Sequence, residues 1–156
     1  MANPQAIGPA IEWVLDALKG MTAAQYGGLE PFLDFRQSWT LAAMMNWPPV
    51  AVLPHSSLFD PEIVGAKASR NRLTVKFGVN GADPDQVTGL AVSYMLAIDA
   101  ALYEADAVAA CANSKRFFIV DHDYGPLYER NGNFAYFPEM HLEIDITEPL
   151  AQGADA

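Results

Sequence analysis

The stretch Met140-His-Leu-Glu-Ile-Asp-Ile-Thr147 alternates apolar and polar side chains at every position. Successive side chains of a β-strand point to opposite faces of its sheet, so the pattern predicts a strand with one buried and one wet face. Glu143 and Asp145 lie on the second face, about 6–7 Å apart along the strand. We therefore expect that face to be solvated and acidic.

Other stretches predict strands that can pair with this one. Residues 72–79 alternate in the same way, residues 116–121 contain an apolar run of four between Arg116 and Asp121, and residues 50–53 form an apolar run between two prolines. Asn131-Gly132-Asn133 is typical of a hairpin turn. Residues 54–70 follow neither the strand period nor the helix period, which predicts an unusually long loop.

Two segments have the 3.6-residue period of an amphipathic helix. In residues 4–19 the apolar stripe includes Ile7, Ile11 and Leu18. A second, longer helix is expected to begin after Asp83, which can cap it, and to reach about residue 106. Its stripe consists of Val87, Leu90, Ala91, Tyr94, Ile98 and Leu102. Residues 21–37 are expected to be irregular or to form short helical turns, and residues 39–47 to hold a short helix.

This order of elements predicts an α+β fold. We expect a mostly antiparallel sheet of about four strands, with the N-terminal helix and the long central helix packed on one face. The 156-residue chain shows no repeat and no low-complexity tract. Residues 1–148 are therefore expected to form a single domain, and residues 149–156 a flexible C-terminal tail.

Composition excludes several classes of protein. The net charge of −10, from nine Lys and Arg against 19 Asp and Glu, opposes tight wrapping around nucleic acid. No uninterrupted apolar stretch of about 18 residues exists, so we expect no membrane-spanning segment. The single cysteine, Cys111, excludes a disulfide framework and a cysteine-based zinc site.

No arrangement of residues points to catalysis. The chain has neither a Gly-x-Ser-x-Gly turn nor a phosphate-binding glycine motif, and Cys111 has the small apolar neighbours of a packed thiol. His55, His122 and His141 lie on separate segments without the spacing of a zinc helix. Asp121-His122-Asp123 could bind a hard cation or orient an imidazole, but a strand end in water explains it better. We expect no catalytic residue, no cofactor and no metal.

The carboxylates of the closing strand are the remaining catalytic candidates. Glu143 and Asp145 have a separation that could suit glycoside chemistry. Any solvated sheet face gives the same pattern, however, so we do not assign them a catalytic role.

The distribution of charge suggests contacts between subunits. Four of the nine basic residues lie within ten positions: Lys67, Arg70, Arg72 and Lys76. From Asp121 onward, eight acids stand against one base, Arg130. A subunit with a basic edge and an acidic edge can associate head to tail, which makes rings. We expect the four basic residues to meet acids of a neighbouring subunit or ring.

The long loop expected over residues 54–70 is a second candidate interface. Its apolar residues, Leu58, Phe59, Ile63 and Val64, would be exposed on an isolated monomer. Exposed apolar patches usually mark interaction sites. We therefore assign these residues to a subunit or ring interface.

Several of these segments occur together in one known family. They are Pro49-Val-Ala-Val-Leu-Pro54 before a variable loop, Arg72–Val79, Gly81-Ala-Asp-Pro-Asp85 with the long helix that contains Tyr94, Val120-Asp-His-Asp-Tyr-Gly-Pro-Leu127, and Leu142–Thr147. This combination resembles the tail-completion or tail-terminator proteins at the neck of long-tailed bacteriophages and tail-like particles. The resemblance covers residues 49–148, and none of its motifs is a catalytic signature.

The resemblance implies a non-enzymatic virion protein, assembled in the host cytoplasm, that forms a homo-oligomeric ring, typically a hexamer. Such a ring caps the last ring of tail tube protein, stops tube growth and offers a docking face to a head-closure or adaptor protein. DNA passes through its lumen without sequence-specific binding, and acidic walls repel phosphate. Glu143 and Asp145 are the lumen-facing candidates.

Two alternatives stay open at this point. The chain could be a head-closure or adaptor protein of an adjacent neck ring. It could instead be a small α/β hotdog-like enzyme or ligand-binding domain that uses Asp121, His122 or Asp123 in a pocket. A ring of discrete order favours a neck protein, whereas a compact dimer with a deep apolar pocket favours the second class.

Overall fold

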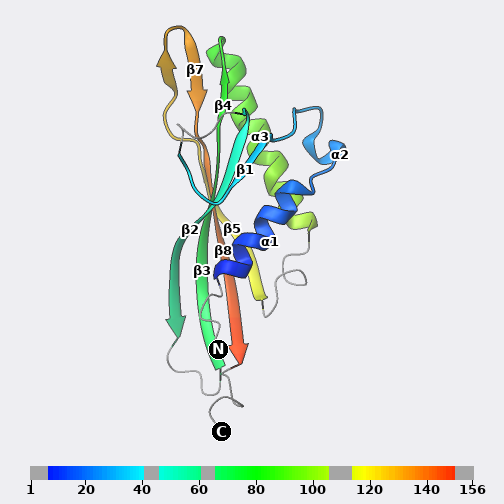
Figure 1. The fold of residues 1–156 in the computed structure, drawn as a ribbon, viewed down its shortest axis with the longest axis vertical. Helices are drawn as coiled ribbons and strands as arrows, with labels where there is room; N and C mark the ends of the chain where they lie inside the picture. Colours follow the sequence, from blue (N-terminus) through cyan, green and yellow to red (C-terminus); the bar gives the residue numbers. More distant parts are fainter. Residues whose placement is uncertain (1–6, 41–45, 61–65, 106–113, 150–156) are drawn as a thin grey trace.

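A computed structural model describes residues 7–40, 46–60, 66–105 and 114–149, and it has the predicted α+β architecture. Figure 1 shows an elongated molecule whose strands run along the long axis. The helices in these ranges are α1 (Ile7–Lys19), α2 (Ala23–Tyr26) and α3 (Pro84–Glu104). The strands are β1 (Asp34–Arg36), β2 (Pro49–Asp60), β3 (Ala66–Phe77), β4 (Val79–Gly81), β5 (Ser114–Asp123), β6 (Tyr128–Arg130), β7 (Asn133–Tyr136) and β8 (Glu139–Pro149).

The strands form two sheets. The larger has the order β1-β2-β3-β8-β5, in which β1 runs parallel to β2 and the other pairs are antiparallel. The smaller, antiparallel sheet has the order β4-β7-β6. Its β6–β7 hairpin turns at Asn131 and Gly132, which both have positive φ, as the predicted turn requires. The predicted strand over residues 72–79 is divided at Gly78 between β3 and β4.

The prediction of a loop over residues 54–70 is wrong. β2 continues to Asp60, and β3 begins at Ala66, so both form one long antiparallel hairpin (Figure 1). The alternation typical of a strand is interrupted in the sequence of β2, because its register against β3 shifts between Pro54 and Ser56. Polar residues also occupy the buried side of β3, where Asn71 has a side chain that is fully buried.

Those buried polar side chains satisfy one another. Ser57 Oγ donates to Asn71 Oδ1 over 2.7 Å, and Asn71 Nδ2 donates to Ser69 Oγ over 2.9 Å and to the Ile144 carbonyl over 3.3 Å. A buried amide that makes these bonds avoids the free-energy cost of lost hydration. The hairpin can therefore be polar in sequence and still pack.

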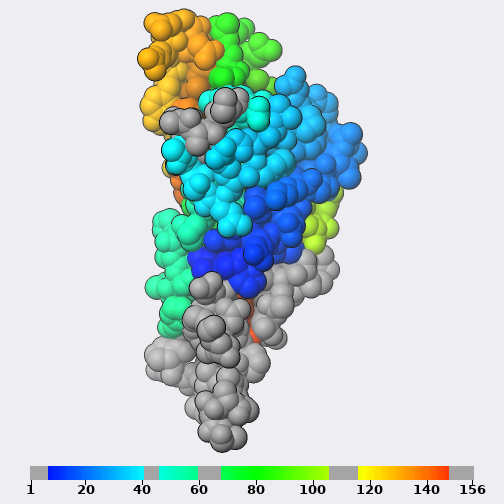
Figure 2. Space-filling model, in the orientation of Figure 1, coloured from blue at the N-terminus to red at the C-terminus, as the bar shows by residue number. Residues whose placement is uncertain are grey.

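The hydrophobic core lies between one face of the five-stranded sheet and the two long helices. The alternating residues of β8 and β3 that were expected to face the helices are fully or almost fully buried: Leu73, Val75, Phe77, Met140, Leu142, Ile144 and Ile146. They pack against the predicted stripes of α1 and α3. Figure 2 shows α1 and the segment that follows it across the middle of the molecule.

The segment between α1 and β1 is held by tyrosine hydroxyls. Tyr94 on α3 donates a hydrogen bond of 2.5 Å to the Glu30 carbonyl, and the Tyr26 hydroxyl accepts one from Phe32 N over 3.2 Å. Burial, with a smaller contribution from the Glu30 charge, raises the pKa of Tyr94 to about 12. These bonds fix the segment over residues 21–37, which was expected to be irregular or to form short helical turns and which contains the four-residue α2 and the three-residue β1.

The ends of several elements differ from the predictions by a few residues. Asp83 caps α3 by accepting from Asp85 N over 3.0 Å, and α3 ends at Glu104. β8 continues to Pro149, one residue beyond the expected end of the domain. Residues 41–45 of the short helix expected over 39–47 lie outside the described residues, as do Cys111 and the rest of the expected tail.

Candidate functional site

The face of the five-stranded sheet that is turned away from α1 and α3, here called the open face, carries most of the predicted site residues. The register sets three basic residues of β3 opposite three acids of β8: Arg70 with Asp145, Arg72 with Glu143 and Lys76 with Glu139. We call these six residues the charged ladder. Their nitrogen–oxygen distances are 3.6, 3.1 and 3.3 Å in the same order.

The prediction that this face is solvated and acidic is wrong at Glu143. Its side chain is only 5% exposed, and Arg72 and Arg70 hold its two oxygens at 3.1 and 3.7 Å. A carboxylate leaves water at low cost only when it is paired in this way. The two arginine side chains are 47% and 54% exposed, so this part of the open face presents guanidinium groups outward.

The ladder also changes how the four basic residues are understood. Arg70, Arg72 and Lys76 already have acid partners within the chain, so a contact with a neighbouring subunit would have to share them. Lys67 lies in β3 opposite Glu148. The assignment of these residues to an interface stays a prediction, as does the placing of Glu143 and Asp145 in a lumen.

The cluster expected at Asp121-His122-Asp123 does not converge. Asp121 Oδ1 lies 2.5 Å from Nδ1 of His141, whereas His122 Nε2 lies 2.9 Å from Asp99 Oδ2 on α3. Asp123 accepts a hydrogen bond from Gly125 N in the turn after β5. Strand alternation sends the neighbouring side chains in different directions. Within the described residues, no three His, Cys, Asp or Glu side chains are placed to hold a metal.

The end of the β2–β3 hairpin carries the predicted apolar interface residues that the structure describes. Leu58 is 60% exposed and Phe59 is 52% exposed. Both line a groove of about 400 Å³, together with Ala68, Ser69, Arg70, Asp145, Ile146 and Thr147. Ile63 and Val64 lie outside the described residues.

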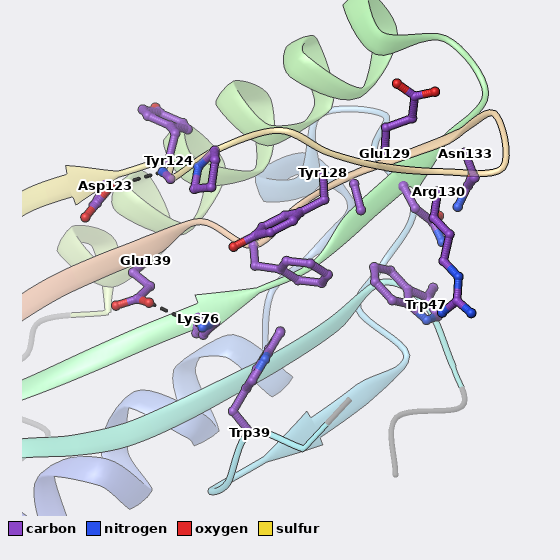
Figure 3. Close-up of a pocket in the computed structure, with 15 residues that line it drawn as sticks. Trp39, Trp47, Lys76, Asp123, Tyr124, Tyr128, Glu129, Arg130, Asn133 and Glu139 are labelled. Atoms are coloured by element: carbon purple, nitrogen blue, oxygen red, sulfur yellow. Dashed lines mark hydrogen bonds and ion pairs between the residues drawn. The ribbon is translucent and has the colours of Figure 1, made fainter. Parts of the chain in front are cut away.

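A pocket of about 860 Å³ lies at the other end of the charged ladder, where Lys76, Glu139, Trp39, Trp47 and the β6–β7 hairpin line it (Figure 3). Phe137 contacts three of its aromatic rings: Trp39 and Trp47, each at 5.9 Å between centroids, and Tyr128 at 5.6 Å. Lys76 Nζ lies 5.1 Å from the centre of the Trp39 ring. We call this site the aromatic pocket.

Gly78 allows one wall of the aromatic pocket to form. A Cβ atom at this position would come within 2.8 Å of the Trp47 ring. Only glycine lets the indole approach the backbone this closely. The sequence analysis missed the pocket because its aromatic residues are spread over three segments, with no local period to connect them.

The outer face of α3 is a further surface that the sequence analysis missed. Val92 (39%) and Leu96 (57%) are exposed on it, and Tyr103 (54%) on the same side reaches β5, where its ring lies 5.6 Å from that of Phe117 and its hydroxyl accepts from Ile119 N over 3.4 Å. They recur at intervals of four and seven residues, which keeps them on one side of a helix. By length and composition α3 could cross a membrane, with a mean hydropathy of 1.2 over an 18-residue window, but seven of its residues are buried in the core of this fold.

The chain was compared with known families, curated proteins and solved structures. No family model matches it, and no curated protein matches it either. Among solved structures, it is similar to a chain from a "virion of native gene transfer agent (GTA) particle", with 9% identity and a TM-score of 0.40. That alignment covers 92% of this chain and 99% of the other.

Proposed function

We propose that this chain is a non-enzymatic structural protein of a virion, which forms a homo-oligomeric ring at the head–tail neck. The ring terminates the tail tube, offers its other side to a head-closure or adaptor protein, and lets DNA pass. The observation that carries the proposal is the exposed end of the β2–β3 hairpin. Leu58 and Phe59 are both more than half exposed there, and Leu58 lies on the face that also carries half-exposed arginines.

The hairpin end has the composition of a contact surface. Aromatic side chains and arginine are enriched in protein interfaces, and a few such residues carry most of the binding free energy. Leu58 lies directly opposite Arg70 in the register, so both belong to one patch. A long hairpin that ends in such a patch is suited to reach a neighbouring subunit.

Two further observations support a neck ring in particular. The element order that resembles the tail-terminator family over residues 49–148 is present in the fold, with β2, β3, α3, β5 and β8 in the expected sequence. The net charge of −10 would prevent DNA from adhering to a channel formed by several copies. A neighbouring neck ring, formed by a head-closure or adaptor protein, has the same requirements and is the alternative within this class.

The aromatic pocket favours a second candidate of another class, a ligand-binding domain. Its volume of about 860 Å³ would accommodate a small molecule, and its walls combine aromatic rings with a few charged groups, as ligand sites do. The sequence analysis named Asp121, His122 and Asp123 for a ligand-binding domain. Asp123 lines the aromatic pocket, whereas Asp121 lines a separate cavity beside His55 and His141.

The proposed function can be tested by adding the purified chain to its cognate tail tube protein during polymerisation. We expect shorter tubes with the chain bound at one end, as measured by electron microscopy with a labelled chain. The hairpin variant Leu58→Asp should lose this effect, and the matched control Leu33→Asp should keep it, because Leu33 is 59% exposed and lies outside the hairpin. Unchanged tube lengths with no bound chain would contradict tail termination, and binding to the portal side of isolated heads alone would favour the head-closure alternative.

A further inference from the structure

We propose that the outer edge of β2 pairs, strand against strand, with the outer edge of β5 of a second copy of this chain. The inference rests on the proposed ring and specifies its subunit contact. β2 and β5 lie toward opposite ends of the five-stranded sheet, whose order is β1-β2-β3-β8-β5. The pairing would therefore continue the sheet of each subunit into that of the next.

The second half of β2 has no strand on its outer side among the described residues. β1 pairs only with Pro49–Ala51, whereas β3 pairs with the inner side of β2 as far as Asp60. Figure 1 shows this half of β2 along the border of the sheet. The main-chain groups of a strand alternate between its two sides, so every second residue here directs its N–H and C=O groups outward. Such an edge is a template for another strand.

The outer edge of β2 lacks the features that usually protect an exposed strand. Pro54 and the register shift beside it interrupt the edge at its start, but residues 56–59, Ser-Ser-Leu-Phe, contain no charge and no proline. Leu58 and Phe59 are 60% and 52% exposed and point to opposite faces of the sheet. A flat partner surface covers only one of them, whereas an added strand contacts both. These two side chains therefore favour a strand as the occupant.

β5 ends the sheet on the other side and offers a matching edge. Residues 117–120, Phe-Phe-Ile-Val, are apolar, and Val120 is 41% exposed. Ile119 N donates to the Tyr103 hydroxyl over 3.4 Å, so this N–H points away from β8 and toward the outer edge. A hydrogen bond of this length is weak, and the Tyr103 side chain is 54% exposed. The Ile119 N–H can therefore exchange this hydroxyl for a main-chain carbonyl of an added strand.

One register suits the side chains on both faces. When Leu58 lies opposite Phe118 of the next copy, Phe59 lies opposite Phe117. Leu58 and Phe118 both belong to the open face, because their neighbours in β3 and β8 are residues of the charged ladder. Phe59 and Phe117 both belong to the other face. Apolar and aromatic cross-strand pairs of this kind stabilise an antiparallel sheet.

The directions of the strands allow the contact to repeat. Each pair from β2 to β5 is antiparallel, so β2 and β5 run in opposite directions. A second copy that stands beside the first in the same orientation therefore brings its β2 antiparallel to β5, and repetition of this step forms a ring when its rotation closes. A two-fold pairing of β2 with β2 suits the side chains less well, because Leu58 opposite Leu58 sets Phe59 opposite Ser57.

The inference can be tested with a disulfide between copies. The double variant Leu58→Cys/Phe118→Cys, in a Cys111→Ser background, is oxidised and analysed on a non-reducing gel. Within one subunit β3 and β8 separate the two positions, by at least about 14 Å from three strand spacings, which a disulfide cannot bridge. We expect covalent dimers, trimers and larger species up to the size of the ring, all of which return to monomer on reduction.

The single variants and a matched pair make the result specific. Leu58→Cys mixed with Phe118→Cys should give covalent heterodimers that cannot extend. The control Leu33→Cys/Phe118→Cys should give no such series, because Leu33 is as exposed as Leu58 but lies outside β2. Efficient covalent dimers of either single variant alone would indicate a two-fold pairing and overturn the inference.

The failure of the inference can be distinguished from the failure of the proposed function. If the wild type forms rings and the double variant forms them without covalent species, the β2–β5 pairing is wrong, although the ring stands. If the wild type is monomeric at every concentration, the ring is refuted and the β2–β5 pairing with it.

Discussion

The two faces of the five-stranded sheet are built from the same alternating strands, yet they are stabilised differently. The face toward α1 and α3 excludes water with apolar side chains, and Leu73, Leu142 and Ile144 are fully buried there. The open face has no described helix on it and buries a carboxylate, Glu143, under two arginines. The comparison teaches that alternation predicts which face a residue lies on, but not whether that face is wet.

The first prediction concerns the apolar face, where the largest effect is expected. Leu142→Ala should lower the free energy of unfolding by about 2–5 kcal/mol, because it leaves a cavity in the middle of the central strand β8. Urea denaturation followed by circular dichroism measures the change. A loss well below 1 kcal/mol would mean that this face is not the tightly packed side of the sheet.

The second prediction concerns the buried carboxylate of the open face. Arg72→Ala should cost about 1–3 kcal/mol, since Glu143 would stay buried with only Arg70 at 3.7 Å. The double variant Arg72→Ala/Glu143→Ala should recover part of the loss, because it removes the unpaired charge. Double-mutant analysis by urea denaturation gives the coupling. If the two losses simply add, the pair does not stabilise the open face.

The third prediction concerns Tyr94, a polar exception on the helix side. Tyr94→Phe should cost about 0.5–1.5 kcal/mol at neutral pH, because it removes the hydrogen bond to the Glu30 carbonyl. The pKa of Tyr94 is raised to about 12, so the protonated hydroxyl stabilises the fold fully below pH 10 and loses that effect as pH rises toward 12. Unfolding measured from pH 8 to 12 should show a steeper decline for the wild type than for Tyr94→Phe. Parallel curves would exclude this role.

The fourth prediction has the smallest expected effect. Lys76→Met removes the pair with Glu139, in which both side chains are partly exposed, and should change the free energy of unfolding by less than about 1 kcal/mol. Thermal unfolding at low and high salt measures it. A larger, salt-dependent loss in the free energy of unfolding would mean that the Lys76–Glu139 pair stabilises the fold as strongly as the buried pair of Arg72 and Glu143.

Local patterns predicted most of the fold. The strands around residues 50–53, 72–77, 116–121 and 140–147, both long helices and the Asn131-Gly132 turn follow from periods and turn residues that act over a few positions. The hairpin over 54–70 could not be predicted, because its pairing depends on a register shift and on buried polar contacts with β8. Those contacts join residues more than 70 positions apart, beyond the reach of any local pattern.

The candidate surfaces were only partly predictable. Leu58 and Phe59 were identified because apolar residues in a polar segment stand out in the sequence. The burial of Glu143 could not be predicted, since it depends on which strands of the sheet become its neighbours. The outer stripe of α3 could have been found, because Val92 and Leu96 break the polar side expected of an amphipathic helix.

The ring itself is the central claim, and imaging the purified full chain by negative-stain electron microscopy over a range of concentrations tests it most directly. The proposed neck ring predicts closed rings of one discrete order with an open centre, which dissociate in the Leu58→Asp variant and persist in Leu33→Asp. Monomers or compact two-fold dimers of the wild type at every concentration would contradict it.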